Sequence, residues 1–179
     1  MTLHRQGGKS IGNDDRQVVA FGMLGGVVSQ LLGRGLVQPS PQVGALEVNV
    51  AVGCWEGYNL VIHELAHKLD MLNGDANGLP PLHSSMRLEA WATAMQSAYD
   101  ALNVTLDADP EVHTEIDPYA AENPAEFFAV TSEYFFSAPD LLQASYPEVY
   151  AQLQAFYRQD PLARLQGLQK SHPDYAEPH

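Results

Sequence analysis

One apolar stretch, Asn59–Asp70, constrains the fold of this 179-residue chain more than any other part of it. Its apolar residues surround much of a helical cylinder, as is typical of a buried helix. Asn59 is a suitable N-cap, and Asn73-Gly74 is a suitable stop signal beyond the C-terminal end. The sequence therefore predicts a buried helix that begins after Asn59 and ends by Asn73.

The same stretch carries His63, Glu64 and His67 in the pattern His-Glu-x-x-His. Residues four apart on a helix point to the same side, so the two imidazoles could occupy adjacent corners of a zinc tetrahedron. Glu64, next to His63, is placed to act as a general base without being a ligand. The alternative is that the pattern is incidental; the apolar flanks and the helix signals favour zinc.

Composition narrows the possible functions. The formal net charge of −13 argues against binding a nucleic-acid backbone or an anionic membrane surface. The single cysteine, Cys54, can form no internal disulfide, which favours a reducing compartment, so we expect a cytoplasmic location. With one cysteine a structural zinc site is also disfavoured, because such sites usually close all four positions with cysteine or histidine.

Other segments suggest a mainly helical domain. Residues 45–52 alternate partly and are rich in valine, which predicts a strand that either edges the cleft or lies in the core. Residues 18–37 are apolar but rich in glycine, and they favour a buried helix or strand pair over a signal or anchor. Further helices are expected at 84–102, 123–136 and 146–160.

A catalytic zinc takes three protein ligands and one open position, so a third ligand is required. The candidates are Glu122, Glu126 and Glu133. Glu126 is the strongest, because an unpaired carboxylate in an otherwise apolar helix would be costly. It could instead serve only as the capping-box partner of Asn123. Glu133 lies two turns further along the same face and could be a ligand, or it or Asp70 could hold a metal-bound imidazole.

Three separated motifs together resemble the Mlc titration factor A family of zinc peptidases. They are His63–Asp70, Asp117–Ala121 and Pro124–Pro139, and the resemblance extends from about residue 57 to residue 165. The catalytic domain of that family is similar to that of anthrax lethal factor. The resemblance implies an α+β, mostly helical, zincin-like domain with a small sheet edging the active-site cleft. It also implies a gluzincin-type Zn²⁺ site.

In that site the resemblance implies that His63, His67 and Glu126 hold the metal. It also implies that Glu64 is the base and that the hydroxyl of Tyr119 donates a hydrogen bond to the developing oxyanion.

From the extent of the resemblance we expect residues 56–168 to form the catalytic domain. Residues 1–55 are expected to be a divergent N-terminal segment, incomplete relative to the family, and residues 169–179 a disordered tail.

The expected function is aminopeptidase-like hydrolysis of peptides. The alternative is a non-catalytic protein that sequesters an Mlc-like transcriptional repressor in the control of sugar uptake. A peptide substrate and a repressor are thus the expected partners, whereas nucleic acid and membrane are not.

Overall fold

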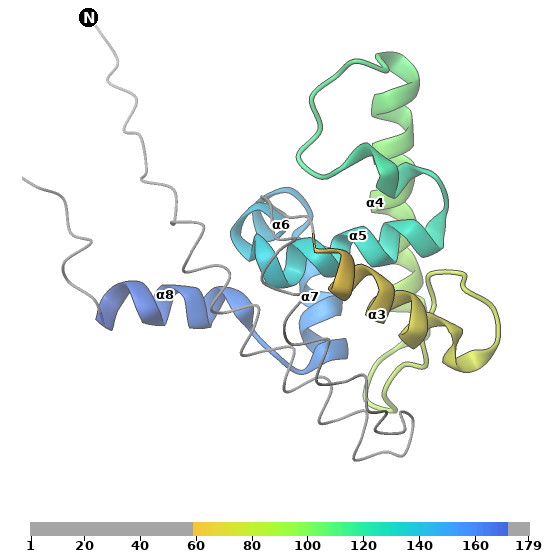
Figure 1. Cartoon of the computed structure of the whole chain (residues 1–179). Coiled ribbons are helices and arrows are strands. Elements are labelled where there is room, and N and C mark those ends of the chain that lie inside the picture. Colours follow the sequence, from red (N-terminus) through yellow and green to blue (C-terminus); the bar gives the residue numbers. More distant parts are fainter. Residues whose placement is uncertain (1–58, 172–179) are drawn as a thin grey trace, which may run out of the picture.

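A computed structural model describes residues 59–171, which form a helical bundle (Figure 1). Short 3₁₀ helices, η2 (Met71–Asn73) and η3 (Pro118–Ala121), accompany the α-helices. The α-helices are α3 (Leu60–Asp70), α4 (Leu88–Ala108), α5 (Pro124–Ser137), α6 (Pro139–Ser145), α7 (Pro147–Tyr157) and α8 (Pro161–Ser171).

Helix α3 begins where the sequence predicts. The side chain of Asn59 accepts a hydrogen bond from the backbone N–H of Ile62 at 3.2 Å, which confirms Asn59 as the N-cap. The helix ends at Asp70, and Gly74, with φ of 128°, follows the short η2 turn. Only glycine adopts this backbone conformation without strain, so the stop signal predicted at Asn73-Gly74 is also confirmed.

Helix α5 is the buried centre of the bundle. Nearly all its side chains are shielded from solvent, among them the polar Thr131 and Ser132. Their hydroxyls donate to the carbonyls of Phe127 and Phe128, four residues earlier, at 2.7 Å each. These bonds satisfy the buried hydroxyls within the helix itself, so α5 can pack apolar side chains on every side.

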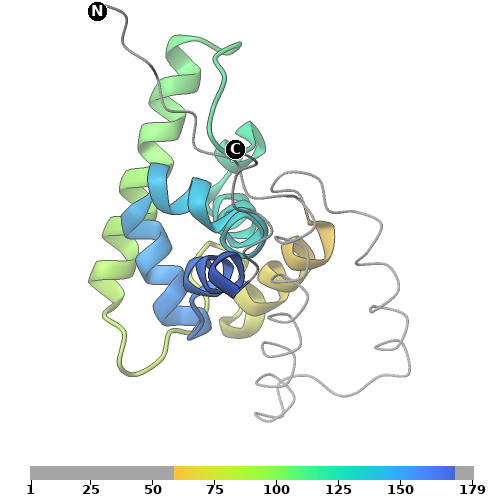
Figure 2. The same ribbon diagram turned by 90° about the vertical axis from the view of Figure 1, so that its left-hand side faces the viewer.

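The other helices cover α5 from different directions. Helix α3 packs against it, and α4 runs crosswise to it alongside α7 (Figures 1 and 2). The core between them is dominated by aromatic rings that meet mostly edge to face, an arrangement that aromatic pairs favour. Its largest fully buried side chains include Trp91, Phe127, Phe128, Phe135 and Phe136.

The expectation of an α+β fold with a small sheet is wrong for the part of the chain that the structure describes. Residues 59–171 contain helices and connecting segments but no strand. Their apolar residues recur at helical spacing, which buries one face of the outer helices and nearly all of α5, and gives no alternating pattern for a sheet. The strand expected at 45–52 and the apolar segment 18–37 lie outside the described residues, as do residues 172–179 of the expected tail.

A helix that crosses a bilayer must be both long and apolar. None of the helices in the described part of the chain, from α3 to α8, has both properties.

Candidate metal centre

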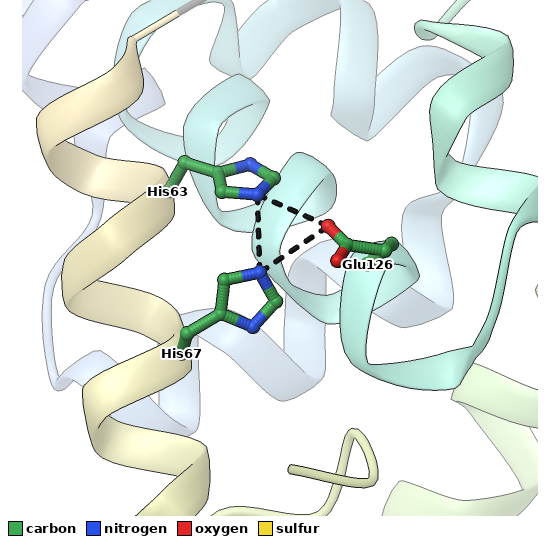
Figure 3. A group of neighbouring side chains, drawn as sticks. All are labelled: His63, His67 and Glu126. Atoms are coloured by element: carbon green, nitrogen blue, oxygen red, sulfur yellow. Dashed lines mark hydrogen bonds and ion pairs between the residues drawn. The ribbon is translucent and has the colours of Figure 1, made fainter.

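The structure brings His63, His67 and Glu126 together, one donor atom from each residue lying within 4.8 Å of the others. Both histidines project from α3 toward Glu126 at the start of α5 (Figure 3). The two Nε2 atoms are 3.1 Å apart. Oε2 of Glu126 lies 3.0 Å from Nε2 of His63 and 3.2 Å from Nε2 of His67. Two helices far apart in the sequence therefore supply one group of three donors.

The chemistry and spacing of these donors fit a metal ion. Two imidazole nitrogens and a carboxylate oxygen that face one another repel unless a cation or a proton lies between them. In a tetrahedral site with metal–ligand bonds of about 2.0 Å, the ligands lie about 3.3 Å apart. The observed separations of 3.0 to 3.2 Å are close to that value. The three side chains are only 11%, 19% and 16% exposed for His63, His67 and Glu126, so the group is shielded yet reachable from solvent.

Glu133 holds His63 from the opposite side of the ring. Its Oε1 lies 2.6 Å from Nδ1 of His63, and its Oε2 accepts the backbone N–H of Asn59 at 2.5 Å. This hydrogen bond is the main reason why the pKa of His63 is raised, and it outweighs the opposing effect of burial. A proton on Nδ1 leaves the lone pair of Nε2 facing Glu126 and His67, the tautomer that a metal ligand requires.

Local structure fixes the position of Glu126. The Asn123 side chain accepts from the N–H groups of Ala125 and Glu126 at 3.0 and 3.1 Å, and Pro124 occupies the first turn. Asn123 thus caps α5 as predicted. The carboxylate of Glu126 reaches across to the two imidazoles, so capping alone does not describe this residue.

Glu64 and Tyr119 lie at the solvent side of the group. Glu64 is exposed on α3 next to His63, and its charge contributes to the raised pKa of that histidine. Tyr119 is 51% exposed in η3, and its ring centroid lies 6.2 Å from that of His63. The charge of Glu126 is the main cause of a raised pKa of Tyr119, so this phenol keeps its proton and can donate a hydrogen bond.

The remaining acidic candidates lie elsewhere. Glu122 is exposed at the end of η3. Asp70 is fully buried and accepts from the backbone N–H of Gly78, so it holds a loop rather than an imidazole. Sequence reasoning missed the backbone N–H of Asn59 as the second partner of Glu133. No residue type signals such a contact, because every residue except proline carries this donor.

The chain is similar in sequence to several proteins that share one name. The chain is 50% identical to Mlc titration factor A of Edwardsiella ictaluri over 121 residues, covering 67% of this chain and 46% of that protein. It is also 50% identical to the proteins of that name from Pectobacterium atrosepticum (64% of this chain and 43% of that protein) and from Yersinia pestis strain Pestoides F (68% and 45%). The chain thus spans slightly less than half the length of these relatives.

A sequence model of one family of metallopeptidases matches most of the region that the structure describes. The match covers residues 47–158 and includes every residue of the metal centre. A metal cofactor is a property of that family, and the three donors described above are suited to bind one. The chain belongs to the glucose-regulated metallo-peptidase M90 family.

Proposed function

We propose that this protein is a zinc-dependent peptidase whose metal is held by His63, His67 and Glu126. The observation that carries the proposal is the convergence of two imidazoles and one carboxylate beside the exposed Glu64. Catalytic zinc sites can use two histidines and one glutamate as ligands and leave the fourth position open. When bound, the metal would polarise the scissile carbonyl and lower the pKa of water toward about 7.

The protein's own residues would then carry the proton and stabilise charge. Glu64 accepts a proton from the attacking water as the water oxygen bonds to the carbonyl carbon. It returns that proton to the amine nitrogen as the carbon–nitrogen bond breaks. The hydroxyl of Tyr119 donates to the oxygen that becomes negatively charged in the transition state. Glu133 keeps the ring of His63 in the required orientation throughout.

We further propose aminopeptidase-like cleavage, following the family resemblance. The test compares aminoacyl p-nitroanilides that carry a free α-amino group with the same compounds acetylated at that nitrogen. Hydrolysis of the free series alone would support an aminopeptidase. Equal hydrolysis of both series would support an endopeptidase-like enzyme instead.

Glu64→Gln is the test of the catalytic mechanism. The amide cannot accept the proton from water, so hydrolysis should fall to background, whereas the zinc content should stay at that of the parent because Glu64 is not a ligand. Glu89→Gln, at an exposed position on α4, is the matched control and should hydrolyse peptides like the parent. Parental rates in Glu64→Gln would refute the mechanism.

A second candidate function is sequestration of a transcriptional repressor in sugar-uptake control. It is favoured by the relatives, each of which carries the name Mlc titration factor A. The two functions are compatible, and Glu64→Gln separates them, since a binding role should survive the loss of the base. Binding would be measured with the Glu64→Gln protein and an immobilised Mlc-like repressor. Because the chain spans under half of these relatives, the binding role is tested on this chain itself.

The cytoplasmic location expected from the single cysteine is part of the same proposal. Cell fractionation with an antibody against this protein would test it.

A further inference from the structure

Helices α3 and α5 run antiparallel and are joined at both ends of the metal centre. At one end Glu133 of α5 holds His63 and Asn59. At the other end, Gly78 in the loop between η2 and α4 contacts both helices. The residues that Gly78 contacts on the two helices are Asp70, three residues beyond His67, and Pro124, two residues before Glu126, so this second junction adjoins both ligands.

Asp70 ties the loop to α3. Its side chain is fully buried, and Oδ2 accepts the N–H of Gly78 at 2.7 Å. The N–H groups of Asn77 and Leu79 also point toward the carboxyl and lower its pKa, although burial has the larger, opposite effect. Oδ1 is buried without a hydrogen-bond partner. Burying a carboxyl that is only partly satisfied is costly, so this contact needs a structural or functional reason.

Gly78 ties the loop to α5. Its φ is 78°, and a Cβ atom at this position would lie 2.4 Å from the carbonyl oxygen of Pro124. The two backbones therefore approach each other more closely than any side chain would permit. Pro124 occupies the first turn of α5, so this contact sets where the helix begins relative to the loop.

Trp91 ties the loop to α4. Its Nε1–H donates to the carbonyl oxygen of Gly78 at 3.1 Å, and its ring packs edge to face on Phe128 and Phe156. A pocket of about 250 Å³ borders the same place and is lined in part by Gly78, Trp91 and Pro124. The three contacts at Gly78 therefore join the loop to three helices beside this surface hollow, and Asn73 adds a hydrogen bond from its amide to the carbonyl oxygen of Leu79.

We propose that Asp70, Gly78, Trp91 and Pro124 form a brace, called here the Gly78 brace, that sets the distance between His67 and Glu126 and thereby the affinity for the metal. The residues of the brace are positioning residues, because they act through the ligands and do not touch the metal. The proposal rests on the metal site in the proposed function, and its test measures metal binding rather than hydrolysis.

Gly78→Ala tests the brace directly, and Gly74→Ala is its matched control. Both glycines have positive φ in the same loop, but a Cβ at Gly74 meets no atom within 4 Å. Gly78→Ala must push Pro124 away and should weaken zinc binding about 10-fold or more, the usual effect of losing support around a ligand. Gly74→Ala should bind zinc like the parent. Zinc affinity would be measured by competition with a chromophoric chelator.

A general loss of stability must be distinguished from misplacement of the ligands. Leu153→Ala, a core truncation on α7, should lower the melting temperature without changing zinc affinity. The visible spectrum of the Co²⁺-loaded protein gives a second readout, since it reports ligand geometry. It should shift in Gly78→Ala and stay unchanged in Leu153→Ala. An equal loss of affinity in both variants, or none in Gly78→Ala, would overturn the proposal.

Milder variants cover the case in which Gly78→Ala does not fold. Trp91→Phe removes the hydrogen bond to Gly78 and keeps an aromatic ring at this position, although the smaller ring fills less of the buried site. Asp70→Ala removes the acceptor, whereas Asp70→Asn restores one and should recover most of the zinc affinity. Asp75→Ala, an exposed loop position, is the control. Parental zinc affinity in both Asp70→Ala and Trp91→Phe would also refute the brace.

The outcomes separate this proposal from the proposed function. A parent protein that binds zinc but hydrolyses no peptide would contradict the function and leave the brace in place. Parental zinc affinity in His67→Ala would overturn both.

Discussion

Glu133→Gln is the substitution that most directly tests how the metal centre is organised. Both carboxylate oxygens of Glu133 accept a hydrogen bond, one from Nδ1–H of His63 and one from the backbone of Asn59. Glutamine has the same shape but offers one oxygen acceptor and one NH₂ donor. In the variant, either His63 or Asn59 must therefore face a donor instead of an acceptor.

The consequences differ for the two possible arrangements. If the NH₂ group faces Asn59, one buried N–H loses its partner, which costs about 1–3 kcal/mol of stability. If it faces His63, the ring changes tautomer so that Nδ1 accepts, and Nε2 then carries the proton. That proton points at Glu126 and His67 and must be removed before a metal can bind.

We expect zinc affinity to fall about 10- to 100-fold, the usual effect of losing a carboxylate that orients a metal-bound histidine. This corresponds to about 1.4–2.7 kcal/mol of binding free energy. The loss should be seen in chelator competition, and the melting temperature in EDTA should fall as well.

Glu148→Gln is the control for charge. It removes one carboxylate at an exposed position in the first turn of α7 and should bind zinc like the parent. If Glu133→Gln matched the parent in both zinc affinity and melting temperature, the role assigned to Glu133 would be wrong.

Four further predictions concern catalysis, packing, pH and the metal. Tyr119→Phe should lower kcat about 10²–10³-fold with zinc content unchanged, because only the hydroxyl is lost; steady-state assays beside metal analysis would check this. Phe128→Ala, which empties a fully buried site, should cost about 3–5 kcal/mol in urea denaturation. Burial raises the pKa of Asp70 in the folded protein above its ordinary 3.8. The protonated carboxyl therefore contributes stability that is fully present below pH 3.8 and is lost as the pH rises through the folded-state pKa. Asp70→Asn lacks this dependence, and denaturation across a pH series should show the parent losing stability relative to the variant as pH rises; the opposite trend would contradict the assignment. Finally, free zinc at 100 times its dissociation constant should stabilise the fold by about 2.7 kcal/mol, measured as a melting shift that EDTA reverses.

The geometry around α3 could be expected from the sequence because it depends on local signals. Helical spacing places His63 and His67 on one face, and the cap at Asn59 is a matter of residue type. The cost of an unpaired carboxylate in an apolar helix singled out Glu126 from other acidic residues. Periodicity placed Glu133 on the same face, but it could not say which imidazole nitrogen Glu133 would meet.

Other features depend on contacts that the sequence does not display. No helix was expected between residues 136 and 146, but proline is favoured in the first turn of a helix, and α6 begins at Pro139. Helix α4 was expected to end at Leu102 but continues to Ala108 through Val104 and Thr105. The role of Gly78 was missed because its partners lie in three different helices. The sheet was expected from family resemblance and from residues 45–52, outside the described part of the chain.

The link between α4 and η3 has a practical consequence for engineering this protein. Residues 109–115 are mostly exposed, and in the sequence they lie between the end of α4 and the start of η3. Lengthening an exposed connection costs little loop entropy, and such sites are where insertions are best tolerated. A fluorescent reporter or an affinity module inserted there should leave α3 and α5 in their present relative position, so that the ligands keep their arrangement.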